Sequence, residues 1–255
     1  MEYLLVCLVA LFASGLTLFS GFGLGTLLLP AFALFFPLPV SIAMTAMVHL
    51  ANNLFKFLLT GRHARLDVVL RFGITAVPAA WIGAWWLEKL DTLPQLAQWQ
   101  LGAHIYHVTP VGFCIGTLLI AFALFESLPA TFGESFSPRW LPVGGALSGF
   151  FGGLSGQQGA LRSAFLLRAG LTKEAYIGTG VALACLVDLT RIPLYARHLG
   201  LAGQQPGLVI AAALSAWVGA FFGARFLHKV TYAVVQSLVV VLLVLLGILI
   251  GAGII

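Results

Sequence analysis

The chain has 255 residues, of which 60% are hydrophobic and only 8% are charged. A soluble globular protein carries roughly 25% charged residues, so this composition excludes a soluble domain and predicts an all-α polytopic membrane protein. The net charge of +5 arises from scattered basic residues and not from a basic cluster. The expected partner is therefore the lipid bilayer and not nucleic acid.

Apolar runs follow one another along the chain, and a helix needs about 20 residues to cross a bilayer. The longer runs are 3–20, 40–59, 66–87, 105–125, 174–195, 205–226 and 233–254. Three further runs, at 24–36, 139–152 and 157–168, are too short to cross alone. The short runs flank two glycine-rich stretches, SGFGLGTLLLP at 20–30 and GGLSGQQGALR at 152–162. Each of these stretches is expected to break a helix.

The two halves of the chain share three motifs in the same order, which indicates a duplication. The matched pairs are GFGLG at 21–25 with GGLSG at 152–156, Asn53-x-x-Lys56 and Arg62-His63 with Asp188-x-x-Arg191 and Arg197-His198, and AWIGAWW at 80–86 with AWVGAFF at 216–222. The predicted units are a first transmembrane repeat at 1–125, a cytoplasmic linker at 126–138 and a second transmembrane repeat at 139–255.

The charge of the loops distinguishes parallel repeats from inverted ones. If each broken segment crosses the membrane once, the repeats are parallel and the basic residues divide evenly between the two faces. If each broken segment is a hairpin, re-entrant or fully spanning, the repeats are inverted. One face then carries Arg62, Arg65, Arg71, Arg139, Arg168, Lys173, Arg225 and Lys229, and the other carries Lys89 and Arg197.

Cytoplasmic loops collect Lys and Arg, so the uneven division favours the inverted arrangement. The sequence therefore predicts two inverted repeats, each with a glycine-broken helical hairpin plus three transmembrane helices. Both termini are expected on the outside. The loops at 60–66, 126–138, 169–173 and 227–232 are expected in the cytoplasm.

The two breaks are candidates for a binding site. An unpaired backbone group in lipid costs several kcal/mol, so a helix breaks there only beside protein or a water-filled cavity. Broken helices in inverted repeats build the midplane sites of secondary transporters. The half-helices are expected to begin near Thr26 and Gln157, with N–H groups that favour an anion.

Glycines also let helices pack closely, which is the alternative interpretation of each one. We assign packing to Gly144, Gly145, Gly149 and Gly219. We assign the breaks to Gly21, Gly23, Gly25, Gly152, Gly153, Gly156 and Gly159.

Polar residues at membrane depth are candidates for function. The predicted substrate-binding residues are Gly23, Gly25, Thr26, Asn52, Asn53, Gly156, Gln157, Gln158, Gly159 and Arg162. Lys56 and Arg191 lie near helix ends, where snorkelling to the interface is the alternative. Asp188 and Arg191 are the predicted coupling residues, and a structural ion pair three residues apart is their alternative. His49 is interpreted as a packed histidine, with proton relay as its alternative.

The stretches GFGLGTLLLP, AMTAMVHLANNLFKF and PAAWIGAWW, with their counterparts in the second half, resemble the TauE/SafE family. The resemblance covers nearly the whole chain. It implies a multi-pass protein of the bacterial inner membrane that exports sulfite or organosulfonates.

The predicted function is a secondary transporter of small sulfur-containing anions by alternating access around a midplane site. No G-x-x-x-x-G-K-[ST] motif is present, so the energy is expected from a gradient, protons included, or from a partner. No catalytic residue, cofactor or metal is expected, and a homodimer is left open. The alternatives are an anion channel, an accessory membrane subunit or a membrane enzyme. An enzyme is disfavoured because Asp188 is the only acidic residue expected at depth.

Overall fold

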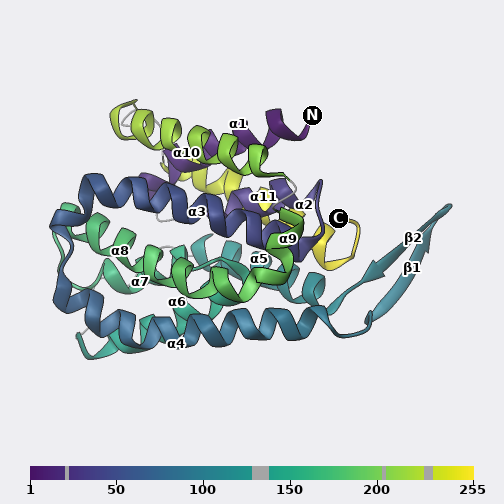
Figure 1. Cartoon of the computed structure of the whole chain (residues 1–255), viewed down its shortest axis with the longest axis horizontal. Coiled ribbons are helices and arrows are strands. Elements are labelled where there is room, and N and C mark those ends of the chain that lie inside the picture. The colour runs from purple at the N-terminus through teal and green to yellow at the C-terminus, as the bar shows by residue number, and fades with distance from the viewer. Residues whose placement is uncertain (21–22, 128–137, 203–204, 227–231) are drawn as a thin grey trace.

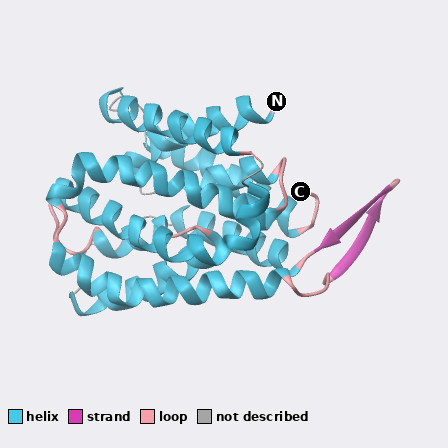
Figure 2. Ribbon diagram, in the orientation of Figure 1, coloured by secondary structure: helices cyan, strands magenta, loops and turns pink. Residues whose placement is uncertain are grey.

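The computed structural model describes residues 1–20, 23–127, 138–202, 205–226 and 232–255. Over these residues the chain is mostly helical, and its helices lie side by side in a bundle (Figures 1 and 2). The first half contains α1 (Glu2–Ser20), α2 (Leu24–Ala33), α3 (Leu38–Thr60), η1 (Gly61–His63), α4 (Leu66–Asp91) and α5 (Pro110–Ser127). The second half contains η2 (Pro138–Trp140), α6 (Leu141–Ser155), α7 (Gly159–Leu166), α8 (Lys173–Arg191), η3 (Ile192–Tyr195), α9 (Ala196–Ala202), α10 (Pro206–Phe226) and α11 (Tyr232–Gly251).

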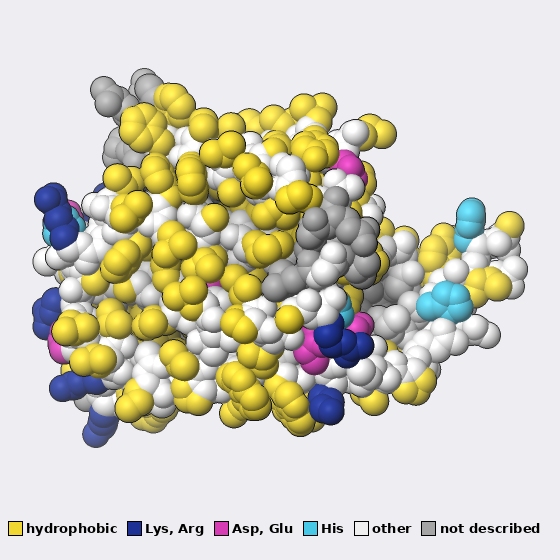
Figure 3. Space-filling model, in the orientation of Figure 1, with side chains coloured by type: hydrophobic (Ala, Val, Ile, Leu, Met, Phe, Trp, Pro, Cys, Tyr) yellow, Lys and Arg dark blue, Asp and Glu magenta, His cyan; other side chains and the backbone are white. Residues whose placement is uncertain are grey.

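Four helical segments in the described part of the chain are long and apolar enough to cross a membrane. They are Leu38–His63, Leu66–Asp91, Lys173–His198 and Pro206–Gly223. Glu2–Leu16, Leu24–Ala33, Pro110–Phe125 and Val239–Gly251 are shorter apolar helices. Figure 3 shows hydrophobic side chains over the middle of the molecule, with Lys and Arg side chains towards its two ends. The predicted class of a helical, multi-pass chain agrees with this arrangement.

A β-hairpin corrects the prediction that the chain is all-α and that a helix begins near residue 105. Strand β1 (Ala97–Leu101) pairs antiparallel with β2 (His104–Val108), and Trp99 stacks on Tyr106 at a centroid distance of 4.7 Å. Gly102 has a φ of 62° at the first central position of the two-residue turn, which suits a Gly-X hairpin. The hairpin projects beyond the ends of the helices (Figure 2), and α5 begins after it at Pro110.

Glycines bring two pairs of parallel helices into backbone contact. Along α6, a Cβ added at Gly145, Gly149 or Gly153 would collide with the backbone of α4 at Phe72, Ala76 or Ala80 respectively. The same close packing joins α1 to α10, where Gly219 and Gly223 lie against the backbone at Leu11 and Gly15. Packing therefore explains Gly145, Gly149 and Gly219 as predicted. It also explains Gly153, which the sequence had assigned to the break.

Two other pairs of helices are antiparallel. In α3 and α8, Gly178 lies against the carbonyl of Thr60, while His49 contacts Asp188. In α5 and α11, Gly112 lies against the carbonyl of Ile250 and Gly116 against that of Gly247. Each pair joins one helix from the first half of the chain to one from the second.

The breaks lie close to the predicted places. The first half-helix begins at Leu24 and the second at Gly159, each about two residues from the expected start. Helix α6 continues through Gly152 and ends at Ser155, because Gly156, with a φ of 81°, supplies the left-handed conformation that ends a helix. Gly21, Lys229 and most of the predicted linker 126–138 lie outside the described residues.

Candidate functional site

The two breaks meet in the interior of the bundle. A Cβ added at Gly25 would lie 3.3 Å from the carbonyl oxygen of Gly156, and one at Gly23 would lie 3.9 Å from Cα of Gly159. The N-termini of α2 and α7 are therefore close neighbours, although 131 or more residues of chain separate the matched motifs. Because these ends carry unpaired N–H groups, their meeting point favours negative charge.

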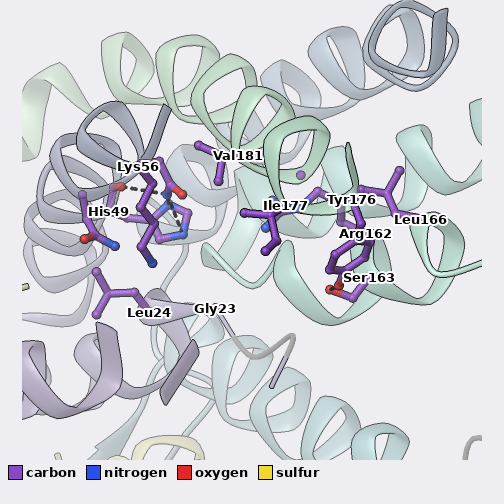
Figure 4. Close-up of a pocket in the computed structure, with 13 residues that line it drawn as sticks. Gly23, Leu24, His49, Lys56, Arg162, Ser163, Leu166, Tyr176, Ile177 and Val181 are labelled. Carbon is purple, nitrogen blue, oxygen red and sulfur yellow. Dashed lines mark hydrogen bonds between the residues drawn. The ribbon is translucent and has the colours of Figure 1, made fainter. Parts of the chain in front are cut away.

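A cavity adjoins this meeting point, and its empty space, which includes open solvent at its mouth, is about 600 Å³. Four helices line it: α2 with Gly23 and Leu24; α3 with His49, Asn52, Asn53 and Lys56; α7 with Arg162, Ser163 and Leu166; and α8 with Tyr176, Ile177, Gly180 and Val181. In Figure 4, His49 and Lys56 lie on one side of the cavity, and Arg162, Ser163 and Tyr176 on the other. Both halves of the chain thus contribute to one cavity.

Helix α3 places a polar stripe along the cavity. His49, Asn52, Asn53 and Lys56 follow the spacing that puts side chains on one face of a helix. Asn52 accepts a hydrogen bond from Ser14 Oγ at 3.0 Å, whereas its Nδ2 has no partner among the described residues. An amide donor is therefore available in a buried, cavity-lining position.

Two cations face the cavity without a carboxylate partner. Lys56 is only 8% exposed, and no described carboxylate forms an ion pair with it or with Arg162. Arg162 Nη1 instead donates to Gln158 Oε1 at 2.9 Å. Lys56 is buried and Arg162 is half-buried. A buried cation without a counter-charge is costly, so an anion in the cavity would relieve a penalty that falls mainly on Lys56.

Asp188 and Arg191 form a network behind the cavity. Both side chains are fully buried, and Arg191 Nη2 lies 2.8 Å from Asp188 Oδ1. Arg191 also donates to the Gly152 carbonyl at 3.0 Å, and Tyr195 donates to that of Gly153, so the two side chains satisfy carbonyls at the end of α6. The structural ion pair is present. Snorkelling is wrong for the buried Arg191 and for Lys56, which lines the cavity.

Four of the predicted substrate-binding residues line the cavity: Gly23, Asn52, Asn53 and Arg162. The others, Gly25, Thr26, Gly156, Gln157, Gln158 and Gly159, do not line it. The Thr26 hydroxyl donates to the Gly23 carbonyl at 2.6 Å, while both polar atoms of the Gln157 amide are buried with no described partner. These residues build the breaks that border the cavity.

Sequence reasoning missed several residues that line the cavity. His49 was interpreted as a packed histidine, yet it lines the cavity and contacts Asp188. The signal was its spacing of three, four and seven residues from Asn52, Asn53 and Lys56. Tyr176 and Ser163 also line the cavity and share a hydrogen bond of 2.9 Å. Their sequence context carried no comparable signal.

Comparison with known proteins gives one family. The family model described as sulfite exporter TauE/SafE matches residues 6–250. Neither the comparison with curated proteins nor that with solved structures gives a match. Because the matched region covers nearly all of the chain and includes every element that lines the cavity, the chain belongs to the TauE/SafE sulfite exporter family of membrane transporters.

Proposed function

We propose that this protein is a secondary transporter that exports a small sulfur oxyanion, sulfite or an organosulfonate, from the cytoplasm. The observation that carries the proposal is that Lys56 and Arg162 face one cavity and that no carboxylate among the described residues pairs with either. Asp188 and Arg191 neutralise each other behind it, so with His49 neutral the lining carries a net charge of two positive units. Such a site attracts an anion and rejects a cation.

The chemistry of the lining suits an oxyanion with a small apolar group. The Arg162 guanidinium offers a planar two-point grip, and the Lys56 ammonium and Asn52 amide add donors. Leu24, Leu166, Ile177 and Val181 supply an apolar wall. We therefore expect sulfite or a short sulfonate to fit better than a large or cationic solute.

The packing of the helices supports a pair of inverted repeats, divided at the predicted linker. Counterparts α3 and α8 pack on each other, as do α5 and α11, and both pairs are antiparallel. In the two repeats, α1 corresponds to α6 and α4 corresponds to α10. Helix α1 packs on α10, and α6 packs on α4, so the same contact is made twice with the repeats interchanged. A pseudo-two-fold axis across the helices would produce this pattern of contacts.

The cavity lies on the η1 side of the His49–Asp188 pair. Lys56 follows His49 along α3, and Tyr176, Ile177 and Val181 precede Asp188 along the antiparallel α8. The Asp188–Arg191–Tyr195 network closes the other side. Alternating access would open that side while the η1 side closes. Asp188 and Arg191, the predicted coupling residues, would then act by forming the barrier that closes this side.

The orientation proposed is both termini outside the inner membrane. Of the basic residues used in the charge count, Arg62, Arg65, Arg71, Arg139, Arg168 and Lys173 belong to the η1 end, while Lys89 and Arg197 belong to the hairpin end. Figure 1 shows both chain ends on the side of the bundle from which the hairpin projects. A reporter that is active only in the periplasm should be active after Ile255. Activity of a cytoplasm-only reporter there would refute the inverted arrangement.

A binding screen on the purified protein tests the function. Sulfite, methanesulfonate and thiosulfate should bind, and acetate and choline should bind weakly or not at all. Transport in liposomes should saturate at a rate expected of a carrier, whereas a continuous pore would pass ions far faster. If no sulfur anion binds, or if cations bind equally well, the proposed function is wrong.

A further inference from the structure

Asp188 is poorly placed to exchange protons with the cavity. It is fully buried and does not line the cavity. Its oxygens contact Arg191 Nε at 2.9 Å, Gln158 Nε2 at 3.2 Å and His49 Nδ1 at 2.5 Å. A carboxylate that accepts hydrogen bonds from a guanidinium and two further donors stays ionised, because its protonation would leave the buried Arg191 without a counter-charge.

His49 lies between this carboxylate and the cavity. Nδ1 points to Asp188, and the residue itself lines the cavity beside Asn53 and Lys56. The Asn53 amide nitrogen donates one N–H to the His49 carbonyl at 2.8 Å, and it also lies 3.2 Å from His49 Nε2. With Nδ1–H donating to Asp188, the other ring nitrogen, Nε2, carries the lone pair. In the neutral ring this lone pair faces the second N–H of the Asn53 amide, and a proton that enters from the cavity would bind there instead.

The charges around His49 determine what its protonation does. Asp188 and Arg191 face it from α8, Arg162 from α7 and Lys56 from α3 itself, while α2 contributes only Gly23 and Leu24 to the cavity. Asp188 and Arg191 cancel. Protonation therefore raises the net charge of the site from two positive units to three, which strengthens anion binding.

We propose that His49 is the residue that takes up a proton when the anion binds and that Asp188 is the fixed base that positions its imidazole. The inference rests on the proposed function. When the anion enters, Nε2 takes up a proton and the imidazolium is held by the Asp188 carboxylate. When the anion leaves, Nε2 releases that proton. By reciprocity, protonation tightens anion binding by the same factor by which the anion favours protonation.

The test counts protons as an anion binds to the full-length protein in detergent. Methanesulfonate is the probe, because a sulfonate keeps one negative charge across the pH range, whereas sulfite itself titrates. Proton uptake is followed with an indicator dye in weakly buffered solution, and affinity is measured between pH about 5.5 and about 8, where an imidazole titrates. The variants are His49→Gln and Asp188→Asn. The matched control is His198→Gln, a histidine that pairs with Glu88 at 2.9 Å, remote from the cavity.

The wild type and His198→Gln should take up protons on binding, and their affinity should fall about tenfold or more as the pH rises. His49→Gln should still bind methanesulfonate, with no proton uptake and an affinity independent of pH. Binding by the wild type without proton uptake would overturn the inference, and this outcome needs no variant. It would also be overturned if His49→Gln kept the uptake while Asp188→Asn lost it. Failure of every sulfur anion to bind would refute the proposed function instead.

Discussion

The motifs Asn53-x-x-Lys56 in α3 and Asp188-x-x-Arg191 in α8 occupy matching places in the two halves but have opposite surroundings. Lys56 lines the cavity and has no carboxylate partner in the described part of the chain. Arg191 is locked to Asp188 and to the end of α6. The carboxylate of Asp188 pairs with the Arg191 cation and fixes it in the fold. The amide of Asn53 cannot neutralise Lys56, whose charge therefore remains available to a ligand.

The largest expected effect comes from breaking the second motif. Asp188→Leu leaves Arg191 buried without a counter-charge, which should cost about 3–5 kcal/mol of unfolding free energy. Denaturant titration in detergent measures it. Lys56→Met is the matched control and should be neutral or stabilising, because it removes a buried cation that pairs with none of the described carboxylates. Equal losses in the two variants would contradict the difference between the motifs.

The first motif should show the reverse pattern. Lys56→Met should weaken methanesulfonate binding by about 10–100-fold, since a charge-assisted hydrogen bond contributes about 1.5–3 kcal/mol. Calorimetry at low salt measures the affinity. Lys89→Met, which removes an exposed cation at the hairpin end, is the control and should bind normally. Unchanged binding in Lys56→Met would place the anion elsewhere.

The sequence predicted the framework of this comparison. The motif pairs, the two breaks and the deep position of Asp188 follow from apolar run lengths and from glycine and charge patterns. The hairpin was missed because its strands, AQWQL and HIYHV, are short and lie next to a long apolar run, which masked the Gly102 turn.

The cavity could be predicted only in part. Helical periodicity on α3 indicates that His49, Asn53 and Lys56 share a face, but it cannot show which helix that face meets. Thr26 and Gln157 were expected at the site because they follow the glycines. Their side chains instead lie where the local turn places them, and that depends on how the break at Gly23 and Gly25 meets the break at Gly156 and Gly159.

A carboxylate introduced into the first motif sharpens the comparison. Asn53→Asp reproduces the chemistry of Asp188-x-x-Arg191 beside Lys56, three residues along α3. The new charge should neutralise Lys56 and weaken methanesulfonate binding about tenfold. Asn53→Leu separates loss of the amide from gain of the charge and should have a smaller effect. If the two variants bind equally, charge at this position does not govern the site.

The smallest effect concerns the cation from the second half of the chain. Arg162→Lys keeps the charge but loses the planar grip and the bond to Gln158, so affinity for methanesulfonate should fall only about threefold. Arg162→Met, which removes the charge as well, should lose about tenfold. Arg139→Lys, at an exposed position on η2, controls for the substitution itself. Calorimetry ranks the three variants. If Arg162→Lys binds as poorly as Arg162→Met, geometry and not charge is what Arg162 contributes, and the site depends on Lys56 for its electrostatic attraction.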